Sequence, residues 1–287
     1  MTSQSSKVAF LTGSTSGIGR ATAQELVKHV SILILPVRNL TKGQDLKQEL
    51  LIINPSCQID LHQCDLESIE SMKACANTIA SKYEAIDILI NNAGTFDYQC
   101  HFTNDGLESH FEVNLLSQYI FNMIFKPLVL RSSQGRIINF SGLSHKAGKF
   151  NLAYIQDRNK SPKSLLNTIS LCADSCLYRN LLTFKLAKDF ENTKVTVNCL
   201  HPGSIKTNIG NDNISLTGKI IAPIFNLFTQ PAIEGAKTSL HLALSDEGGQ
   251  ITGKYWSNCK IDKPSELSTD MDVAEQLVAK CQQLTKV

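Results

Sequence analysis

A glycine-rich turn between a short apolar run and an amphipathic segment constrains the fold of this chain more than any other feature. The apolar run Val8–Leu11 is followed by Thr-Gly-Ser-Thr-Ser-Gly-Ile-Gly and then by residues 20–28, which have the pattern of a helix. Three glycines at this spacing permit a tight turn, close approach of a pyrophosphate and close helix packing, and the helix N-terminus offers free N–H groups to anions. The predicted phosphate-binding residues are Gly13, Ser14, Ser16, Gly17, Ile18 and Gly19.

Further apolar runs alternate with amphipathic segments along the chain. The runs predict buried strands, and the amphipathic stretches are long enough for crossover helices. This alternation predicts an α/β fold: a doubly wound, mostly parallel Rossmann sheet in a single domain over residues 1–287, with its least regular part at 208–235. The predicted strands are 8–11, 32–35, 59–61, 86–90, 136–140 and 195–200, and the predicted helices include 17–28, 67–82 and 106–130.

Composition excludes several classes of protein. The formal net charge is +2 and long basic runs are absent, so nucleic acid is not an expected partner. The first residues lack the pattern of a signal peptide, and no apolar run is expected to reach the ~18 residues of a membrane span. Nine cysteines without the paired spacings of a zinc site indicate reduced thiols and no metal. These features predict a cytoplasmic protein that acts on small molecules.

The end of the second predicted strand bears on which dinucleotide the site prefers. An NAD-preferring site usually presents a carboxylate there, but this chain has Arg38, which suits a 2′-phosphate. NADP is therefore predicted over NAD, with a solvated surface arginine as the alternative. Asp65, after the third strand, fits either a partner for the adenine edge or a helix N-cap before Glu67, and Leu66 beside it belongs to the predicted cofactor site.

Several further motifs stand in the order typical of one family. They are Asn91-Asn92-Ala93-Gly94, Asp105-Gly106-Leu107-Glu108, Val113-Asn114, the run from Arg136 to Ser141, His201-Pro202-Gly203 with Thr207, and Gly253-Lys254-Tyr255-Trp256. With them the chain resembles, over nearly its whole length, the short-chain dehydrogenase/reductase family and its retinol-dehydrogenase-like branch.

The resemblance implies a function and further site residues. It implies an oxidoreductase that uses a nicotinamide cofactor on lipid-like alcohols or carbonyls, so the expected partner is a small apolar alcohol or carbonyl ligand. Family members often form dimers or tetramers, and a homodimer is consistent with that. Many members carry an N-terminal membrane anchor, which this chain is expected to lack. Asn114 corresponds to the catalytic asparagine, and the implied cofactor contacts are Asn92, Ala93, Gly94, Pro202, Gly203 and Thr207.

The same resemblance implies a catalytic serine, tyrosine and lysine, and this chain departs from it at all three. In the family the tyrosine is the acid/base, the lysine lowers its pKa and holds the nicotinamide ribose, and the serine polarises the substrate oxygen. Matching residues 181–190 and 195–198 to the family's helix and next strand puts the tyrosine at Cys172 and the lysine at Cys176. The usual Ser-Ser pair reads Ser141-Gly142, which leaves Ser141 or Ser144 as substitutes that are out of register.

Three functional hypotheses follow. The first is an NADP(H)-binding family member whose catalysis is lost or strongly reduced, a possible pseudoenzyme, because losing a general acid typically costs 10² to 10⁴ in rate. The second is an active oxidoreductase with a relocated proton donor: a water, Cys172, or Tyr154, which has Arg158 four residues on but lies in a predicted loop over 153–163. The third is a non-catalytic interaction scaffold.

The sequence allows more than one interpretation for two segments. Cys172 and Cys176 on one helix face suit oxidant sensing or a soft metal, although two small apolar residues that fill vacated space are favoured. The apolar stretch 216–228 suits a substrate lid, ordinary packing against the sheet, or contact with a membrane surface or partner.

Overall fold

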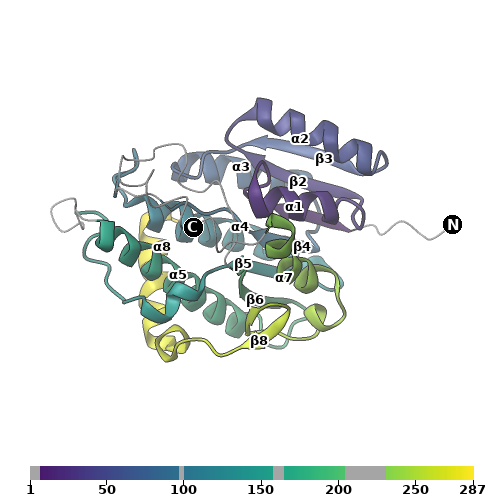
Figure 1. Cartoon of the computed structure of the whole chain (residues 1–287). Helices are drawn as coiled ribbons and strands as arrows, with labels where there is room; N and C mark the ends of the chain where they lie inside the picture. The colour runs from purple at the N-terminus through teal and green to yellow at the C-terminus, as the bar shows by residue number, and fades with distance from the viewer. Residues whose placement is uncertain (1–6, 97–99, 158–164, 204–230) are drawn as a thin grey trace.

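Eight strands form one continuous sheet in the order β3-β2-β1-β4-β5-β6-β7-β8 in the computed structural model, which describes residues 7–96, 100–157, 165–203 and 231–287 (Figure 1). All neighbouring strands are parallel except β7 and β8, which are antiparallel. The predicted doubly wound, mostly parallel sheet is therefore confirmed. The strands are β1 (Val8–Leu11), β2 (Ile32–Val37), β3 (Gln58–Gln63), β4 (Ile88–Asn91), β5 (Arg136–Phe140), β6 (Thr196–His201), β7 (Tyr255–Ser257) and β8 (Lys260–Asp262).

Helices cover both faces of the sheet (Figure 1). Successive strand side chains point to opposite faces, so Phe10 packs in the core under α3, α4, α5 and α8, while its neighbours Ala9 and Leu11 pack under α1, α2 and α7. Each face thereby has its own apolar core. The α-helices are α1 (Gly17–Leu26), α2 (Leu40–Ile53), α3 (Ile69–Lys82), α4 (Ser117–Arg131), α5 (Leu165–Asp189), α7 (Ala232–Leu244) and α8 (Met271–Thr285). Shorter elements are the π-helix η1 (His110–Leu116) and the 3₁₀ helices η2 (Leu143–Ala147), η4 (Glu247–Gly249) and η5 (Glu266–Thr269).

The structure differs from the sequence-based expectation at several element boundaries. Strands β7 and β8 were not expected, because three residues each are too short to show an alternating pattern. The predicted helix over 106–130 begins only at His110 and starts as a π-helix. Gly106 has φ +75°, and the Glu108 carboxylate accepts the Phe111 N–H at 2.9 Å, so the chain turns before the helix begins. Of the region 208–235 that was predicted to be irregular, 208–230 lies outside the described residues, and α7 begins at Ala232.

One helix of the described residues is long and apolar enough to cross a membrane, contrary to the expectation that no stretch reaches that length. It runs over His110–Arg131, with a mean hydropathy of 1.2 in its most apolar window. In this fold 72% of that window is buried, as in the core helix of an α/β protein. Length and composition alone are therefore weak evidence for a membrane span.

A buried carboxyl group lies in the first turn of the π-helix. Glu112 is fully buried; its Oε2 accepts the Thr103 hydroxyl, and its Oε1 has no hydrogen-bond partner within the described part of the chain. Burial raises the pKa of this carboxyl to about 8, and the Thr103 hydrogen bond only partly opposes that shift. The folded protein therefore holds Glu112 protonated near neutral pH.

We expect Glu112→Gln to remove a pH-dependent loss of stability. A carboxyl whose folded pKa is raised contributes stability below its unfolded pKa of ~4.3, and that contribution is lost as the pH rises through the folded value. The melting temperature of the wild type should therefore fall, relative to that of Glu112→Gln, as the pH is raised from about 5 to about 9. Parallel melting curves over this range would contradict the assignment.

Three phenylalanines anchor the larger core. The ring of Phe10 on β1 lies 5.0 Å, centroid to centroid, from the rings of both Phe121 and Phe125 on α4. All three side chains are completely buried. This cluster fixes α4 against the first strand of the sheet.

We expect Phe10→Ala to lower the free energy of unfolding by about 3 to 5 kcal/mol, because it removes a buried ring and leaves a cavity beneath α4. Urea denaturation followed by circular dichroism measures this. The matched control is Ile52→Ala on α2, whose residue is 83% exposed and should change stability by no more than about 0.5 kcal/mol. Equal effects of the two substitutions would show that the cluster is not the anchor.

Candidate functional site

A cleft among the described residues lies at the carboxyl ends of the parallel strands, where the strand order reverses between β1 and β4. Its volume is about 650 Å³. Because the walls come from the segments that follow successive strands, the cleft runs along the sheet edge from Arg38 and Asp65, past the glycine-rich turn and Gly94, to the segments after β5 and β6.

The glycine-rich turn has the geometry of a phosphate cradle. Gly13 and Gly17 have φ +70° and +51°, and a Cβ on Gly19 would lie 2.0 Å from the Gly13 carbonyl oxygen. The Asn92 amide donates to the Thr12 carbonyl at 2.8 Å and so ties this turn to the one after β4. The Ser14 hydroxyl is buried with no hydrogen-bond partner in the described structure. A free hydroxyl beside the N-terminus of α1 suits an anionic ligand.

The structure brings almost the whole predicted cofactor site together. Only Thr207 is missing, because it lies outside the described residues. The predicted residues that line the cleft are Gly13, Ser14, Ser16, Gly17, Ile18, Gly19, Arg38, Asp65, Leu66, Asn92, Ala93, Gly94, Pro202 and Gly203.

Arg38 and Asp65 mark one end of the cleft. The Arg38 side chain is 68% exposed, and its Nη1 lies 4.0 Å from the Glu67 carboxylate, so it is available to an anion. Asp65 accepts the Glu67 N–H at 3.1 Å, but the N-cap of α3 is Ser68, which accepts the Ser71 N–H at 3.2 Å. Asp65 thus caps a turn before α3 and does not cap the helix itself.

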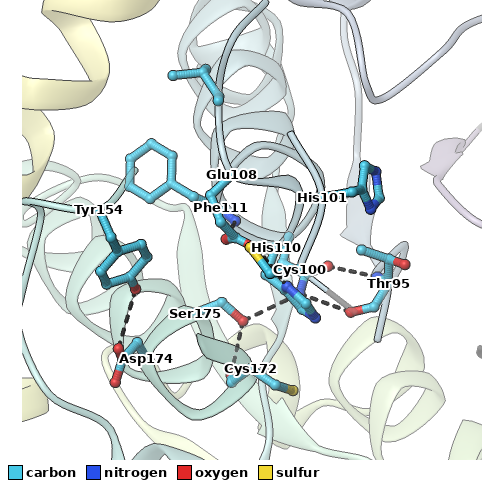
Figure 2. Close-up of polar contacts among 12 residues, drawn as sticks. Thr95, Cys100, His101, Glu108, His110, Phe111, Tyr154, Cys172, Asp174 and Ser175 are labelled. Atoms are coloured by element: carbon cyan, nitrogen blue, oxygen red, sulfur yellow. Dashed lines mark hydrogen bonds and ion pairs between the residues drawn. The ribbon is translucent and has the colours of Figure 1, made fainter. Parts of the chain in front are cut away.

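Asn114 joins three segments beside the cleft. It lies in the π-helix η1, and its amide donates to the Thr95 carbonyl at 3.0 Å and to the Ser175 hydroxyl at 3.2 Å, while its carbonyl oxygen accepts the Thr95 N–H at 2.6 Å. Ser175 in turn donates to the Cys172 carbonyl at 2.8 Å on α5 (Figure 2). Asn114 therefore holds α5 at a fixed position against the turn after β4.

Cys172 and Cys176 lie on consecutive turns of α5 and both line the cleft. Cys176 is 3% exposed, and its sulfur accepts hydrogen bonds from the Ser144 hydroxyl at 3.2 Å and from Arg179 Nη2 at 3.0 Å. A hydrogen bond from Cys172, with the Arg179 charge and Ser144 in addition, holds the pKa of the Cys176 thiol well below its ordinary value. The hydrogen bond to Cys176 and burial raise the pKa of Cys172. The first thiol of this pair to ionise is Cys176.

The segment after β5 contains Ser141 and Gly142, the two positions that the resemblance assigns to a Ser-Ser pair. The Ser141 hydroxyl donates to the Cys176 carbonyl at 2.9 Å, so it is committed to the helix backbone. A Cβ on Gly142 would lie 2.9 Å from the Cys176 sulfur. That sulfur occupies the space that a serine side chain at position 142 would need. Ser144 is the hydroxyl that reaches the sulfur.

Tyr154 is not among the residues that line the cleft. It is 4% exposed, and its hydroxyl donates to the Asp174 carboxylate at 3.1 Å and lies 3.3 Å from the Tyr178 hydroxyl. Figure 2 shows the Tyr154 hydroxyl directed at Asp174 while the Cys172 side chain points away from that pair. Burial raises the pKa of Tyr154 far above its ordinary value. Arg158 lies outside the described residues.

Two cleft residues were missed by the sequence analysis as side chains with a role. His201 was noted only as part of a motif; its Nδ1 accepts the Leu143 N–H at 3.3 Å, and burial lowers the pKa of its imidazole. Arg179 follows Cys176 by three residues and Cys172 by seven, a spacing that places it on the same helix face. That spacing could have identified Arg179 as a cleft residue, whereas the family pattern contains only positions 172 and 176.

We expect the Cys176 thiol to ionise at a lower pH than the other buried thiols. Desolvation raises the pKa values of Cys57, Cys199 and Cys281, so these stay protonated. Thiolate absorbance near 240 nm should therefore show a first titration step that is absent in Cys176→Ser. Because the folded pKa lies below the unfolded value of ~8.5, the associated stability is present above that value and is lost as the pH falls through the folded pKa. An unchanged curve in Cys176→Ser would refute the assignment.

Comparison with known proteins agrees with this geometry. The sequence profile described as short chain dehydrogenase matches residues 7–154. Retinol dehydrogenase 14 of Mus musculus is 32% identical over 286 residues, which cover 94% of this chain and 83% of that protein. Two crystal structures share the fold. An uncharacterized protein from Mycobacterium paratuberculosis has a TM-score of 0.77 at 23% identity, covering 98% of this chain and 94% of that one.

The second is a short chain dehydrogenase from Burkholderia cenocepacia in complex with NADP. It has a TM-score of 0.67 at 20% identity, covering 88% of this chain and 96% of that one. Sequence identity over almost the entire chain is thus highest, among these three, to the retinol dehydrogenase. This protein belongs to the short-chain dehydrogenase family and is a retinol-dehydrogenase-like member of it.

Proposed function

We propose that this protein binds NADP(H) in the cleft and that its oxidoreductase chemistry is lost or strongly reduced. The observation that carries the proposal is the composition of the cleft wall. Its phosphate cradle is complete, yet no tyrosine and no lysine is among the described residues that line it. The cations in that described lining are Arg38 and Arg179.

The residues present fit a phosphorylated dinucleotide. The positive φ angles of Gly13 and Gly17 and the unpaired Ser14 hydroxyl suit a pyrophosphate at the N-terminus of α1. Arg38, exposed at the adenosine end, suits the 2′-phosphate that distinguishes NADP from NAD. The relative from Burkholderia cenocepacia was crystallised with NADP, which supports the same preference in this chain.

The reduced catalysis follows from what the side chains near Asn114 can supply. A bound nicotinamide supplies hydride chemistry, and the protein must supply or accept a proton at the substrate oxygen. Cys172 is shorter than a tyrosine, and its raised pKa makes it a weaker acid than an ordinary thiol. Cys176 and Ser141 are engaged with Arg179 and with the backbone of α5. Of the relocated proton donors considered, Cys172 or a water is favoured over Tyr154, which does not line the cleft.

The ligand class is proposed from the family. By analogy with retinol dehydrogenases, a small apolar alcohol or carbonyl is the expected ligand. The apolar stretch 216–228, which is the candidate lid, lies outside the described residues. A cytoplasmic location and a homodimer remain predictions.

We expect NADPH to raise the melting temperature of the wild type and NADH to raise it less, because a ligand specific for the native state stabilises that state. Arg38→Met should remove the difference between the two ligands, since its side chain faces the 2′-phosphate in this proposal. Differential scanning fluorimetry at equal ligand concentrations measures both effects. If neither dinucleotide stabilises the wild type, the scaffold hypothesis is favoured.

We expect turnover of retinoid, steroid and short-chain carbonyls with saturating NADPH to be about 10² to 10⁴ below that of a relative with its tyrosine in place. NADPH oxidation at 340 nm measures the rate. Tyr154→Phe is the matched control and should leave any residual rate unchanged, because its hydroxyl bonds to Asp174 away from the cleft. Robust turnover that survives Cys172→Ala would overturn the proposal.

A further inference from the structure

Arg179 is a buried cation in the wall of the cleft. It is 6% exposed and lies on the face of α5 that also carries Cys172 and Cys176. Its Nε donates to the Ser175 carbonyl at 3.2 Å and its Nη2 to the Cys176 sulfur at 3.0 Å. Its Nη1 lies 3.7 Å from the point where a Cβ on Gly94 would stand. The guanidinium therefore reaches from α5 to the turn after β4.

The contacts of Arg179 leave part of its bonding capacity unused. A guanidinium has five N–H donors, and the two hydrogen bonds above use two of them. Across the described residues, no carboxylate makes an ion pair with Arg179 within 4.0 Å. A buried charge without such a partner is costly unless an anion or further acceptors face it. The acceptors that Arg179 contacts are the Ser175 carbonyl and the Cys176 sulfur, and its remaining N–H groups are available to a ligand in the cleft.

The order of the strands tells which part of a dinucleotide Arg179 would face. Arg38 and Asp65 follow β2 and β3 at one end of the cleft, and the glycine-rich turn after β1 lies between them and the turn after β4. With the 2′-phosphate at Arg38 and the pyrophosphate at the glycine-rich turn, the other nucleoside lies beyond, towards β4 and β5. Gly94, where Nη1 is placed, belongs to that part.

We propose that Arg179 supplies the positive charge and the N–H donors that hold the nicotinamide ribose, in place of the lysine that the family has at position 176. This inference rests on the dinucleotide site proposed above. The fork of a guanidinium presents two parallel N–H groups, which match the two neighbouring hydroxyl oxygens of a ribose. Arg179 acts here as a binding residue and carries no proton-transfer step.

The proposal also accounts for the small residue at position 176. A lysine there would put its Cγ near the position of the Cys176 sulfur, which lies 3.0 Å from Arg179 Nη2, and would add a second cation to the same wall of the cleft. A cysteine removes that repulsion and accepts a hydrogen bond from Arg179. A cysteine at 176 is thus compatible with Arg179, whereas a lysine at 176 would compete with it for space.

The test compares a whole dinucleotide with half of one. NADPH binding is followed by its fluorescence, and 2′,5′-ADP, which lacks the nicotinamide half, is measured by its competition with NADPH or by calorimetry. We expect Arg179→Met to weaken NADPH binding about 10- to 100-fold while 2′,5′-ADP binds within about twofold of wild type. Arg179→Lys, which keeps the charge and loses the fork, should lie between the two. The matched control Arg38→Met should weaken both ligands.

Each outcome bears on the proposal. Equal weakening of both ligands by Arg179→Met indicates a general effect on the fold and overturns it, as does no weakening of either. Unchanged 2′,5′-ADP affinity in the variant shows that the glycine-rich turn is still folded, so a selective loss of NADPH cannot come from misfolding. If the wild type binds neither ligand, the dinucleotide site itself is refuted and this inference falls with it. If the wild type binds both ligands and the Arg179 variants bind them with the same affinities, the dinucleotide site stands and the inference about Arg179 alone fails.

Discussion

The contact between the turn after β1 and the turn after β4 is the constraint on which the site depends. Three hydrogen bonds make it: the Asn92 amide donates to the Thr12 carbonyl at 2.8 Å and to the Gly13 carbonyl at 3.3 Å, and the Thr12 hydroxyl accepts the Ala93 N–H at 2.9 Å. A Cβ on Gly13 would lie 2.7 Å from the Asn92 amide, so the glycine permits this approach. Since the strand order reverses here, fixing these turns against each other also fixes the floor of the cleft.

The α5 helix is held to that floor by polar contacts that use no side chain at position 172 or 176. Asn114 bonds to Ser175 on one side and to Thr95 on the other, and Ser141 donates to the Cys176 carbonyl. These bonds need only backbone groups, two serine hydroxyls and one side-chain amide. The position of α5 in the fold therefore does not depend on which side chains stand at 172 and 176.

The sequence was sufficient to predict the sheet and the phosphate cradle, because local sequence patterns determine both. Alternating apolar runs and helices determine a parallel sheet, and the spacing of Gly13, Gly17 and Gly19 determines the turn. Local patterns do not show where a side chain points or which distant segments pair. Tyr154 satisfies a Tyr-x-x-x-Arg spacing, yet its hydroxyl is buried against Asp174. Strands β7 and β8 are two short segments that pair only in the complete sheet. The role of Arg179 depends on helix phase and on its distance to Gly94, neither of which a motif contains.

The close packing of Gly142, Cys176 and Arg179 limits which single substitutions this wall of the cleft can accept. A serine at 142 placed first would bring its Cβ to 2.9 Å from the Cys176 sulfur, closer than side-chain carbons normally stand. A lysine at 176 placed first would meet the Arg179 guanidinium. Gly142→Ser or Cys176→Lys made alone would thus meet a neighbouring side chain, so either residue can be introduced only together with a change at that neighbour.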